Sequence, residues 1–311
     1  MKKRVLALAL TACMAASLTA CGGNKAAETT AAATEAATTA AAEAASEAES
    51  TEAATEAAAE LTTVTPGKLT VATSPDFAPY EFYAIGEDGT PTLAGFDMAL
   101  AQYIADYVGL ELEVVTVDFD GVLSELQTKS VDLGMAGLSP DEKRMGIMDF
   151  SDLYYKGGQS LVTVKANAET YNTFEAINKS DVSVGAQTGS IQLDLANINS
   201  PDADIVALPK VTDIIAELLA GKLDAAYIET DVAVSYQRNY PELEIVMDVP
   251  YEVEGSAIGV CKGNEALLNA VNEAIAAALS DGSMEQFVAE ANELASGEKY
   301  EGLLDESGNV Q

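Results

Sequence analysis

Strand-like and helix-like segments alternate along the chain from residue 68 onward, and this alternation restricts the possible folds more than any other feature of the sequence. Residues 68–73 alternate between polar and apolar types and stop just before Pro75, as in a β-strand. Residues 96–107 repeat apolar side chains at helical spacing, and Gly109 is a typical helix stop. Chains with this alternation form α/β folds in which mostly parallel sheets carry helices on both faces.

The same patterns locate the remaining elements of the fold. They predict strands at 111–117, 131–138, 182–186 and 224–228, a short helix around 122–126, a helix after residue 190, a helix capped by Thr212, and two final helices at 265–279 and 283–294. A polar turn and a Val-Asp or Leu-Asp pair precede an apolar strand twice, at 129–133 and at 221–225. Since 311 residues suggest about two domains, this repeat predicts two similar α/β lobes.

The composition excludes several classes of function. The net charge is -34, from 16 basic and 50 acidic residues, which excludes nucleic acid as the main partner because phosphate binding needs a basic face. The chain has no histidine, which rules out a histidine-ligated zinc ion and a Ser/His/Asp triad. Its 3 cysteines are scattered, and we expect Cys261 to be a small buried residue of a strand. We therefore expect no catalytic residue, no metal and no cofactor.

The first 66 residues predict an export signal followed by a spacer. Basic residues at 2–4 precede an apolar stretch at 5–20, as in a secretory signal peptide spanning residues 1–20. The sequence that ends at Cys21 resembles the lipobox of bacterial lipoproteins, which implies a lipid on Cys21 and a chain anchored to the extracytoplasmic face of the cell membrane. An ordinary signal peptide with a chance cysteine is the alternative. Residues 21–66 are rich in Ala, Thr and Glu and predict a disordered tether.

Polar segments follow several of the predicted strands. Ligands of open α/β sheets bind at the carboxyl ends of strands, so these segments are candidates for a binding site. They lie at 73–82, 118–120, 137–144 and 187–190, with 227–231 opposite them. Phe77 and Phe119, in the first two segments, are either core residues or part of the site.

Arginine gives the sharpest indication of a ligand. After residue 20 the chain contains only two arginines, Arg144 and Arg238. A guanidinium group binds a carboxylate through two parallel hydrogen bonds. Arg144 opens a predicted helix directly after a predicted buried strand, so it is either a carboxylate ligand or a surface ion pair. Arg238 lies at a polar helix end, which indicates a solvated side chain.

Three acidic residues at the ends of predicted strands have competing interpretations. Asp118 and Asp120 are either paired catalytic carboxylates or, as we favour, caps of the helix near residue 122. Glu229 either binds a cation or precedes a helix that is capped by one of the two residues after it.

Four short motifs occur in a specific order and spacing. They are Gly95-Phe96-Asp97, Phe119-Asp120-Gly121, Gly137-Leu138-Ser139 followed by Glu142-Lys143-Arg144, and Asp149-Phe150-Ser151. Together they resemble the extracellular solute-binding proteins of ABC importers, polar amino-acid group (solute-binding family 3). The resemblance implies a periplasmic-binding-protein-like fold with one lobe at 67–157 plus 253–311 and a second at 158–252, joined by crossing strands near 155–159 and 252–256. It also implies a monomer that traps a free amino acid between the lobes and delivers it to the permease of an ABC importer.

The resemblance assigns a set of ligand-binding residues to this chain. They are Ser74, Phe77, Phe119, Gly137, Ser139, Arg144, Gln187, Ser190 and Glu229. Arg144 would hold the α-carboxylate of the ligand and Glu229 its α-ammonium group. Gly137, Ser139 and Ser190 would add hydrogen bonds, and the start of a helix at Ser190 would present backbone amides to an anion.

The ligand side chain would lie between the two phenylalanines, with Ser74 and Gln187 facing its end. Many family members carry an acid where Ser74 stands, and often a second threonine where Ile191 stands. The serine favours a neutral or mildly polar side chain over that of lysine or arginine.

Two other classes of function remain open on the sequence. A few proteins of this fold are cell-envelope dehydratases of cyclic amino-acid precursors, but the lack of histidine and of a clear acid/base pair argues against an enzyme. An amino-acid sensing module is the other alternative. A receptor normally carries a transmembrane helix and an output domain, and we expect neither here.

Overall fold

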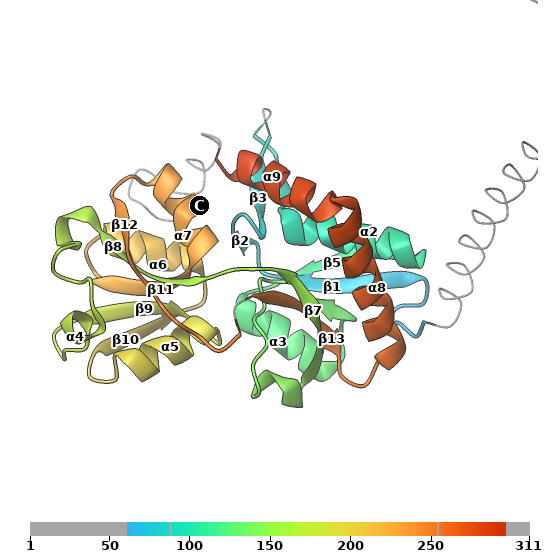
Figure 1. The fold of residues 1–311 in the computed structure, drawn as a ribbon, viewed down its shortest axis with the longest axis horizontal. Coiled ribbons are helices and arrows are strands. Elements are labelled where there is room, and N and C mark those ends of the chain that lie inside the picture. Colours follow the sequence, from blue (N-terminus) through green and yellow to red (C-terminus); the bar gives the residue numbers. More distant parts are fainter. Residues whose placement is uncertain (1–60, 87–88, 254, 297–311) are drawn as a thin grey trace, which may run out of the picture. The chain divides into compact units, whose positions relative to one another are not determined.

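The computed structural model describes residues 61–86, 89–253 and 255–296, which form two lobes with a five-stranded sheet in each (Figure 1). The α/β fold class expected from the alternating pattern is confirmed. The predicted signal peptide, Cys21 and most of the predicted tether lie outside the described residues.

The sheet of the first lobe has the strand order β5-β1-β6-β13-β7. Its strands are β1 (Lys68–Thr73), β5 (Glu111–Thr116), β6 (Leu133–Gly134), β7 (Met148–Tyr155) and β13 (Ser256–Cys261). Successive side chains of β1 point to opposite faces of the sheet. Leu69 and Val71 therefore join the apolar cluster of α2 (Phe96–Val108) and α8 (Glu265–Asp281), whereas Ala72 joins that of α3 (Phe119–Thr128).

Two further parts complete the first lobe. Helix α9 (Ser283–Ala295) follows α8. A small antiparallel sheet inserts between β1 and α2 and consists of β2 (Asp76–Phe77), β3 (Glu81–Ile85) and β4 (Pro91–Ala94).

The sheet of the second lobe has the order β10-β9-β11-β8-β12. Its strands are β8 (Gln159–Val164), β9 (Ser183–Gln187), β10 (Asp204–Leu208), β11 (Ala225–Glu229) and β12 (Leu243–Asp248). The apolar clusters place α6 (Val211–Leu219) and α7 (Thr230–Asn239) on one face, and α4 (Phe174–Ile177) and α5 (Ile191–Asn199) on the other.

The repeated turn predicted from the sequence has the same structural role in both lobes. Asp132 precedes β6, and its carboxylate accepts a hydrogen bond of 2.9 Å from the backbone N–H of Thr70 in β1. Asp224 precedes β11, and its carboxylate accepts a bond of 2.9 Å from the backbone N–H of Ser183 in β9. Each aspartate thus joins two neighbouring parallel strands of its sheet, which confirms the interpretation of two similar lobes.

The prediction of mostly parallel sheets is correct for only part of each sheet. The pairs β1–β5, β1–β6, β9–β10 and β9–β11 are parallel, but the pairs β6–β13, β7–β13, β8–β11 and β8–β12 are antiparallel. The antiparallel strands lie where the chain passes between the lobes. It leaves the first sheet after β7 and returns to it through β13.

Four local predictions need correction. The strand expected at 131–138 is reduced to β6, and Gly137, with a φ of +55°, lies in the loop that follows it. Thr212 is not a helix cap, since α6 begins at Val211. Arg144 lies in a three-residue 3₁₀ turn and not at the start of an α-helix. Cys261, at the end of β13, is half-buried and not buried.

None of the helices in the described part of the chain combines the length and hydrophobicity of a membrane span. Within the same residues, none of the groups of acidic and cysteine side chains is arranged to hold a metal ion.

Candidate ligand-binding site

The structure places the predicted ligand-binding residues at the ends of strands of both lobes or on the loops and helix starts that follow them. All are buried except Gly137, which is half-buried. They fall into three contact groups and not into a single cluster. These groups are centred on Arg144, on Glu229, and on the pair formed by Ser74 and Gln187.

Arg144 is a buried cation of the first lobe, with 8% of its surface exposed. Its guanidinium donates to the carbonyl oxygen of Ser139 at 3.1 Å and, across to the second lobe, to that of Gly189 at 3.1 Å. It also lies 5.5 Å above the ring of Phe119, in cation–π geometry. None of the ion pairs within the described ranges includes Arg144, so the predicted alternative of a surface salt bridge is wrong.

Desolvation affects the ionisation of this guanidinium. Burial lowers the pKa of Arg144, and the nearby carboxylates of Asp141 and Asp194 partly offset that effect. A guanidinium has five N–H groups, and the two carbonyl bonds leave further donors for a ligand carboxylate.

Glu229 is a buried carboxyl group of the second lobe, with 2% of its surface exposed. It ends β11, and its carboxylate caps α7 by accepting from the backbone N–H of Val232 at 2.9 Å. The prediction that one of the next two residues caps this helix is therefore wrong. The carboxylate also accepts from the N–H of Gly158 at 3.2 Å and from the hydroxyl of Tyr80, in the first lobe, at 3.1 Å.

The surroundings of Glu229 disfavour its ionised form. Burial raises the pKa of Glu229 to about 8, and the charge of Asp231 contributes to the increase. No cationic side chain within the described part of the chain forms an ion pair with this carboxylate.

The hydroxyl of Ser190 is already engaged within its own lobe. It donates to the carbonyl oxygen of Gln187 at 2.7 Å and accepts from the N–H of Leu193 at 3.2 Å, so it caps α5. Ser190 can therefore contribute backbone amides to an anion more readily than its side chain.

Gly137 and Phe77 form one wall of the first lobe near the site. A Cβ atom at Gly137 would lie 2.7 Å from the ring of Phe77. The ring of Phe77 in turn lies 5.3 Å from that of Tyr80, centre to centre, which connects this wall to Glu229.

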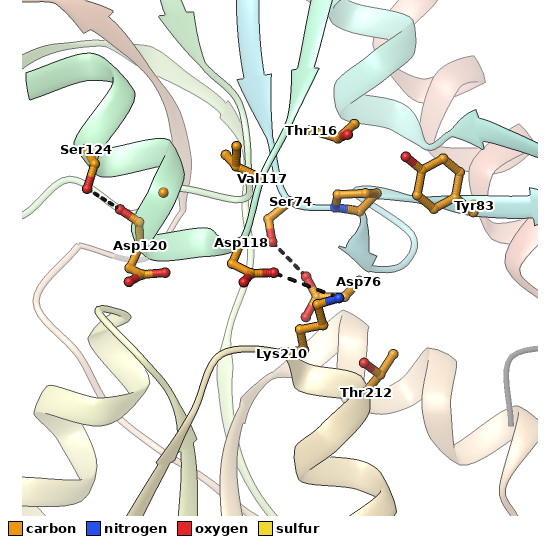
Figure 2. A pocket seen from close by; sticks show the side chains of 12 residues that line it. Ser74, Asp76, Tyr83, Thr116, Val117, Asp118, Asp120, Ser124, Lys210 and Thr212 are labelled. Atoms are coloured by element: carbon orange, nitrogen blue, oxygen red, sulfur yellow. Dashed lines mark hydrogen bonds and ion pairs between the residues drawn. The ribbon is translucent and has the colours of Figure 1, made fainter. Parts of the chain in front are cut away.

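A pocket of about 670 Å³ opens beside Ser74 and is lined by residues of both lobes. Figure 2 shows the acidic side chains of Asp76, Asp118 and Asp120 around it, with Lys210 of the second lobe opposite Asp118. Asp118 and Lys210 form an ion pair of 3.9 Å. Asp118 occupies the N-cap position of α3 without a side-chain cap hydrogen bond, so the capping role expected for it is not found.

Sequence reasoning missed Asp76, Tyr80 and Lys210. Asp76 and Tyr80 lie within a polar segment that the sequence had singled out, but only Ser74 and Phe77 were assigned a role there. The carboxylate of Asp76 accepts hydrogen bonds from Ser74 at 2.8 Å and from the side chain of Gln187 at 3.3 Å. Ser74 and Gln187 are thus joined through a residue that the resemblance did not point to.

Comparison with known proteins identifies the family. The sequence model of the bacterial extracellular solute-binding proteins, family 3, matches residues 69–291. The arginine-binding extracellular protein ArtP of Bacillus subtilis (strain 168) is 32% identical over 223 residues, which are 70% of this chain and 84% of ArtP. Cyclohexadienyl dehydratase of Pseudomonas aeruginosa is 28% identical over 177 residues, which are 57% of this chain and 65% of that enzyme.

A solved structure agrees with the sequence matches. The amino acid ABC transporter substrate-binding protein AbpA of Streptococcus pneumoniae, bound to L-arginine, is 32% identical, with a TM-score of 0.71 over 75% of this chain and 97% of AbpA. The resemblance found in the sequence motifs is confirmed, and the family indicates an extracytoplasmic location. This chain belongs to the bacterial extracellular solute-binding proteins of family 3.

Proposed function

We propose that this protein binds a free amino acid between Arg144 and Glu229 and delivers it to the permease of an ABC importer. The observation that carries the proposal is a buried guanidinium on one lobe and a buried carboxyl group on the other, neither of which has an ion-pair partner among the described side chains. A buried charge is costly unless it is paired. A zwitterionic amino acid brings one group of each sign, so it can neutralise both residues at once.

The aromatic and acidic surroundings favour a cationic side chain on the ligand. Phe77 and Phe119 are buried aromatic residues, and an aromatic ring can hold a guanidinium or ammonium group by a cation–π contact, as Phe119 does with Arg144. Asp118 and Asp120 line the adjacent pocket, and ArtP and AbpA are an arginine-binding and an arginine-bound protein. We therefore propose arginine or a similar cation in place of the neutral side chain that Ser74 suggested.

Binding without chemical conversion is part of the proposal. The relatives that match over most of their length are binding proteins, and the dehydratase matches over a smaller share of both chains. Mass spectrometry of candidate ligands after incubation with the protein should recover them unchanged. A dehydrated product of a cyclic amino-acid precursor would contradict this part of the proposal.

We also propose that the protein acts as a monomer held at the membrane by a lipid on Cys21. The lipobox-like sequence supports the anchor. Cys21→Ser should abolish metabolic labelling with fatty acid and release the protein into the soluble fraction. Labelling that persists in this variant would contradict lipidation at Cys21.

A thermal-shift screen against the twenty common amino acids tests the ligand assignment. A ligand present at about 1,000 times its dissociation constant adds roughly 4 kcal/mol to the free energy of unfolding, which is readily detected. Arginine should give the largest shift, and glutamine is the matched neutral control. A larger shift with glutamine would contradict the proposal of a cationic ligand side chain, but it would still support the proposal that the protein binds an amino acid.

A further inference from the structure

Asp76 is a buried carboxylate of the first lobe whose hydrogen-bond donors come mainly from the second lobe. It lies in β2 and is 7% exposed. Its carboxylate accepts from the backbone N–H of Val211 at 2.5 Å and from the side-chain amide of Gln187 at 3.3 Å. Its backbone carbonyl oxygen accepts from the hydroxyl of Tyr236, on α7, at 3.1 Å.

The bond to Val211 supplies a helix cap from the opposite lobe. Val211 is the first residue of α6, and the first N–H groups of a helix have no partner inside the helix. Lys210 occupies the N-cap position but makes no side-chain cap hydrogen bond. Asp76 takes over this role, and its negative charge suits the positive end of the helix dipole.

Ser74 holds the carboxylate in place from its own lobe. Its hydroxyl donates to the second oxygen of the Asp76 carboxylate at 2.8 Å, which leaves the first oxygen for Val211 and Gln187 (Figure 2 shows Ser74 and Asp76). The interface around this contact is also apolar, since Phe77 and Tyr80 of the first lobe belong to the same buried cluster as Val232 and Tyr236 of the second.

We propose that Asp76 is an interlobe latch: it caps α6 across the interface, holds the two lobes together, and thereby slows the release of ligand. Asp76 is a positioning residue in this role, because it acts on the lobes and not on the bound molecule. The effect on ligand release rests on the proposed amino-acid binding function, but the effect on lobe closure does not require a ligand.

Variants of Asp76 are compared with a variant that removes an exposed contact between the lobes. The comparison distinguishes the effect of the latch from that of an ordinary surface contact. Asp76→Ala removes the acceptor, and Asp76→Asn keeps one amide oxygen for Val211 without the charge. Lys143→Ala is the control, because Lys143 also reaches the second lobe, at Asp194, through an ion pair of 2.8 Å. The side chains of that pair are 74% and 45% exposed, and exposed pairs contribute little.

Two measurements on the purified full chain without ligand test closure directly. Amide hydrogen exchange should show the Val211 N–H exchanging about 10-fold or more faster in Asp76→Ala than in the wild type, with Asp76→Asn between them and Lys143→Ala unchanged. Small-angle scattering should give a larger radius of gyration for Asp76→Ala. If Asp76→Ala does not fold, as judged by circular dichroism, Asp76→Asn carries the same comparison.

Stopped-flow measurements with arginine test the effect on release. The dissociation rate should rise about 10-fold or more in Asp76→Ala, with a smaller change in the association rate. Wild-type exchange at Val211 and a wild-type radius of gyration in the folded Asp76 variants would overturn the latch. If no variant binds any amino acid while exchange and scattering change as expected, the proposed function fails and the latch stands.

Discussion

Arg144 and Glu229, the two buried residues proposed to bind the ligand, form no ion pair within the described chain, and the burial of such groups determines how the protein should respond to pH. The pKa values of Asp76 and Asp97 are raised to about 6 and that of Glu229 to about 8, in each case mainly by burial. Each group therefore holds its proton more tightly in the folded chain than in the unfolded chain.

The resulting prediction concerns stability without ligand. A raised carboxyl pKa gives stability that is complete below the unfolded pKa and is lost as pH rises through the folded value. The melting temperature should therefore fall between about pH 5 and pH 8. The part between pH 6 and pH 8 belongs to Glu229 together with Glu81, whose pKa burial also raises well above its usual range. Glu229→Gln should flatten the curve between pH 6.5 and pH 8.5 in differential scanning calorimetry. An equally steep curve in that variant would contradict the burial of an unpaired Glu229.

A second prediction at the residue scale uses two glycines near the site. At Gly137 the backbone has a φ of +55°, and an added Cβ would lie 2.7 Å from the Phe77 ring. Gly137→Ala should therefore strain the backbone and displace that ring, which lowers the melting temperature and weakens ligand binding. Gly146→Ala is the matched control, because a Cβ there has nothing within 4 Å. Equal melting temperatures and affinities for both variants would show that the Gly137 turn does not shape the site.

The sequence identified residues whose type and position were informative on their own. Arg144 was found because arginine is rare in this chain, and Glu229 because it directly follows a predicted strand. Asp76 and Tyr80 were missed because their partners are far away in the sequence. The bond between Asp76 and Val211 spans 135 residues, and that between Tyr80 and Glu229 spans 149. Contacts of this kind depend on how the lobes pack, which no local pattern contains.

At the scale of the elements, the repeated aspartates make a further prediction. The carboxylate of Asp132 accepts from the backbone N–H groups of Thr70 and Val64 at 2.9 and 2.8 Å. Asp132→Ala leaves the buried N–H of Thr70 without its partner, which costs about 1–3 kcal/mol. Urea denaturation should show that loss. Asp106→Ala, an exposed aspartate on α2, should stay within about 0.5 kcal/mol of the wild type. Equal midpoints for the two variants would contradict the structural role of the repeat.

Element prediction succeeded where the local pattern and the tertiary structure agree. The final helices α8 and α9 begin at Glu265 and Ser283, as their apolar periodicity predicts. The strand predicted at 131–138 is longer than the observed β6. The apolar residues on either side of β6 are also buried, although they lie in loops, so the apolar pattern does not show where the strand begins and ends. The share of parallel strand pairs was overestimated. A strand that returns from the other lobe and pairs in antiparallel orientation has the same sequence pattern as a parallel strand that follows a helix.

At the scale of the whole molecule, the two lobes each supply one half of the proposed charge recognition. The first lobe carries Arg144 and the second carries Glu229, and direct contacts join the lobes at Asp76, at Tyr80 and at Arg238. Arg238 was expected to be solvated. It is exposed but donates to the side chain of Asn292, on α9 of the first lobe, at 3.2 Å. It is therefore unsuitable as a neutral control in binding experiments, and Lys222, which pairs with Glu217 within the second lobe, is a better choice.

Isothermal titration calorimetry with arginine on Arg144→Ala, Glu229→Ala and Lys222→Ala tests the central claim most directly. Loss of either buried charge leaves a ligand charge unpaired, which should cost about 2–5 kcal/mol of binding free energy. At about 1.4 kcal/mol per factor of ten, the dissociation constant should rise roughly 30-fold or more in both site variants and stay unchanged in Lys222→Ala. Arg144→Lys should also bind poorly, since an ammonium group lacks the planar fork of donors. Affinities close to wild type in both Arg144→Ala and Glu229→Ala would contradict the proposed recognition of the ligand by these two residues.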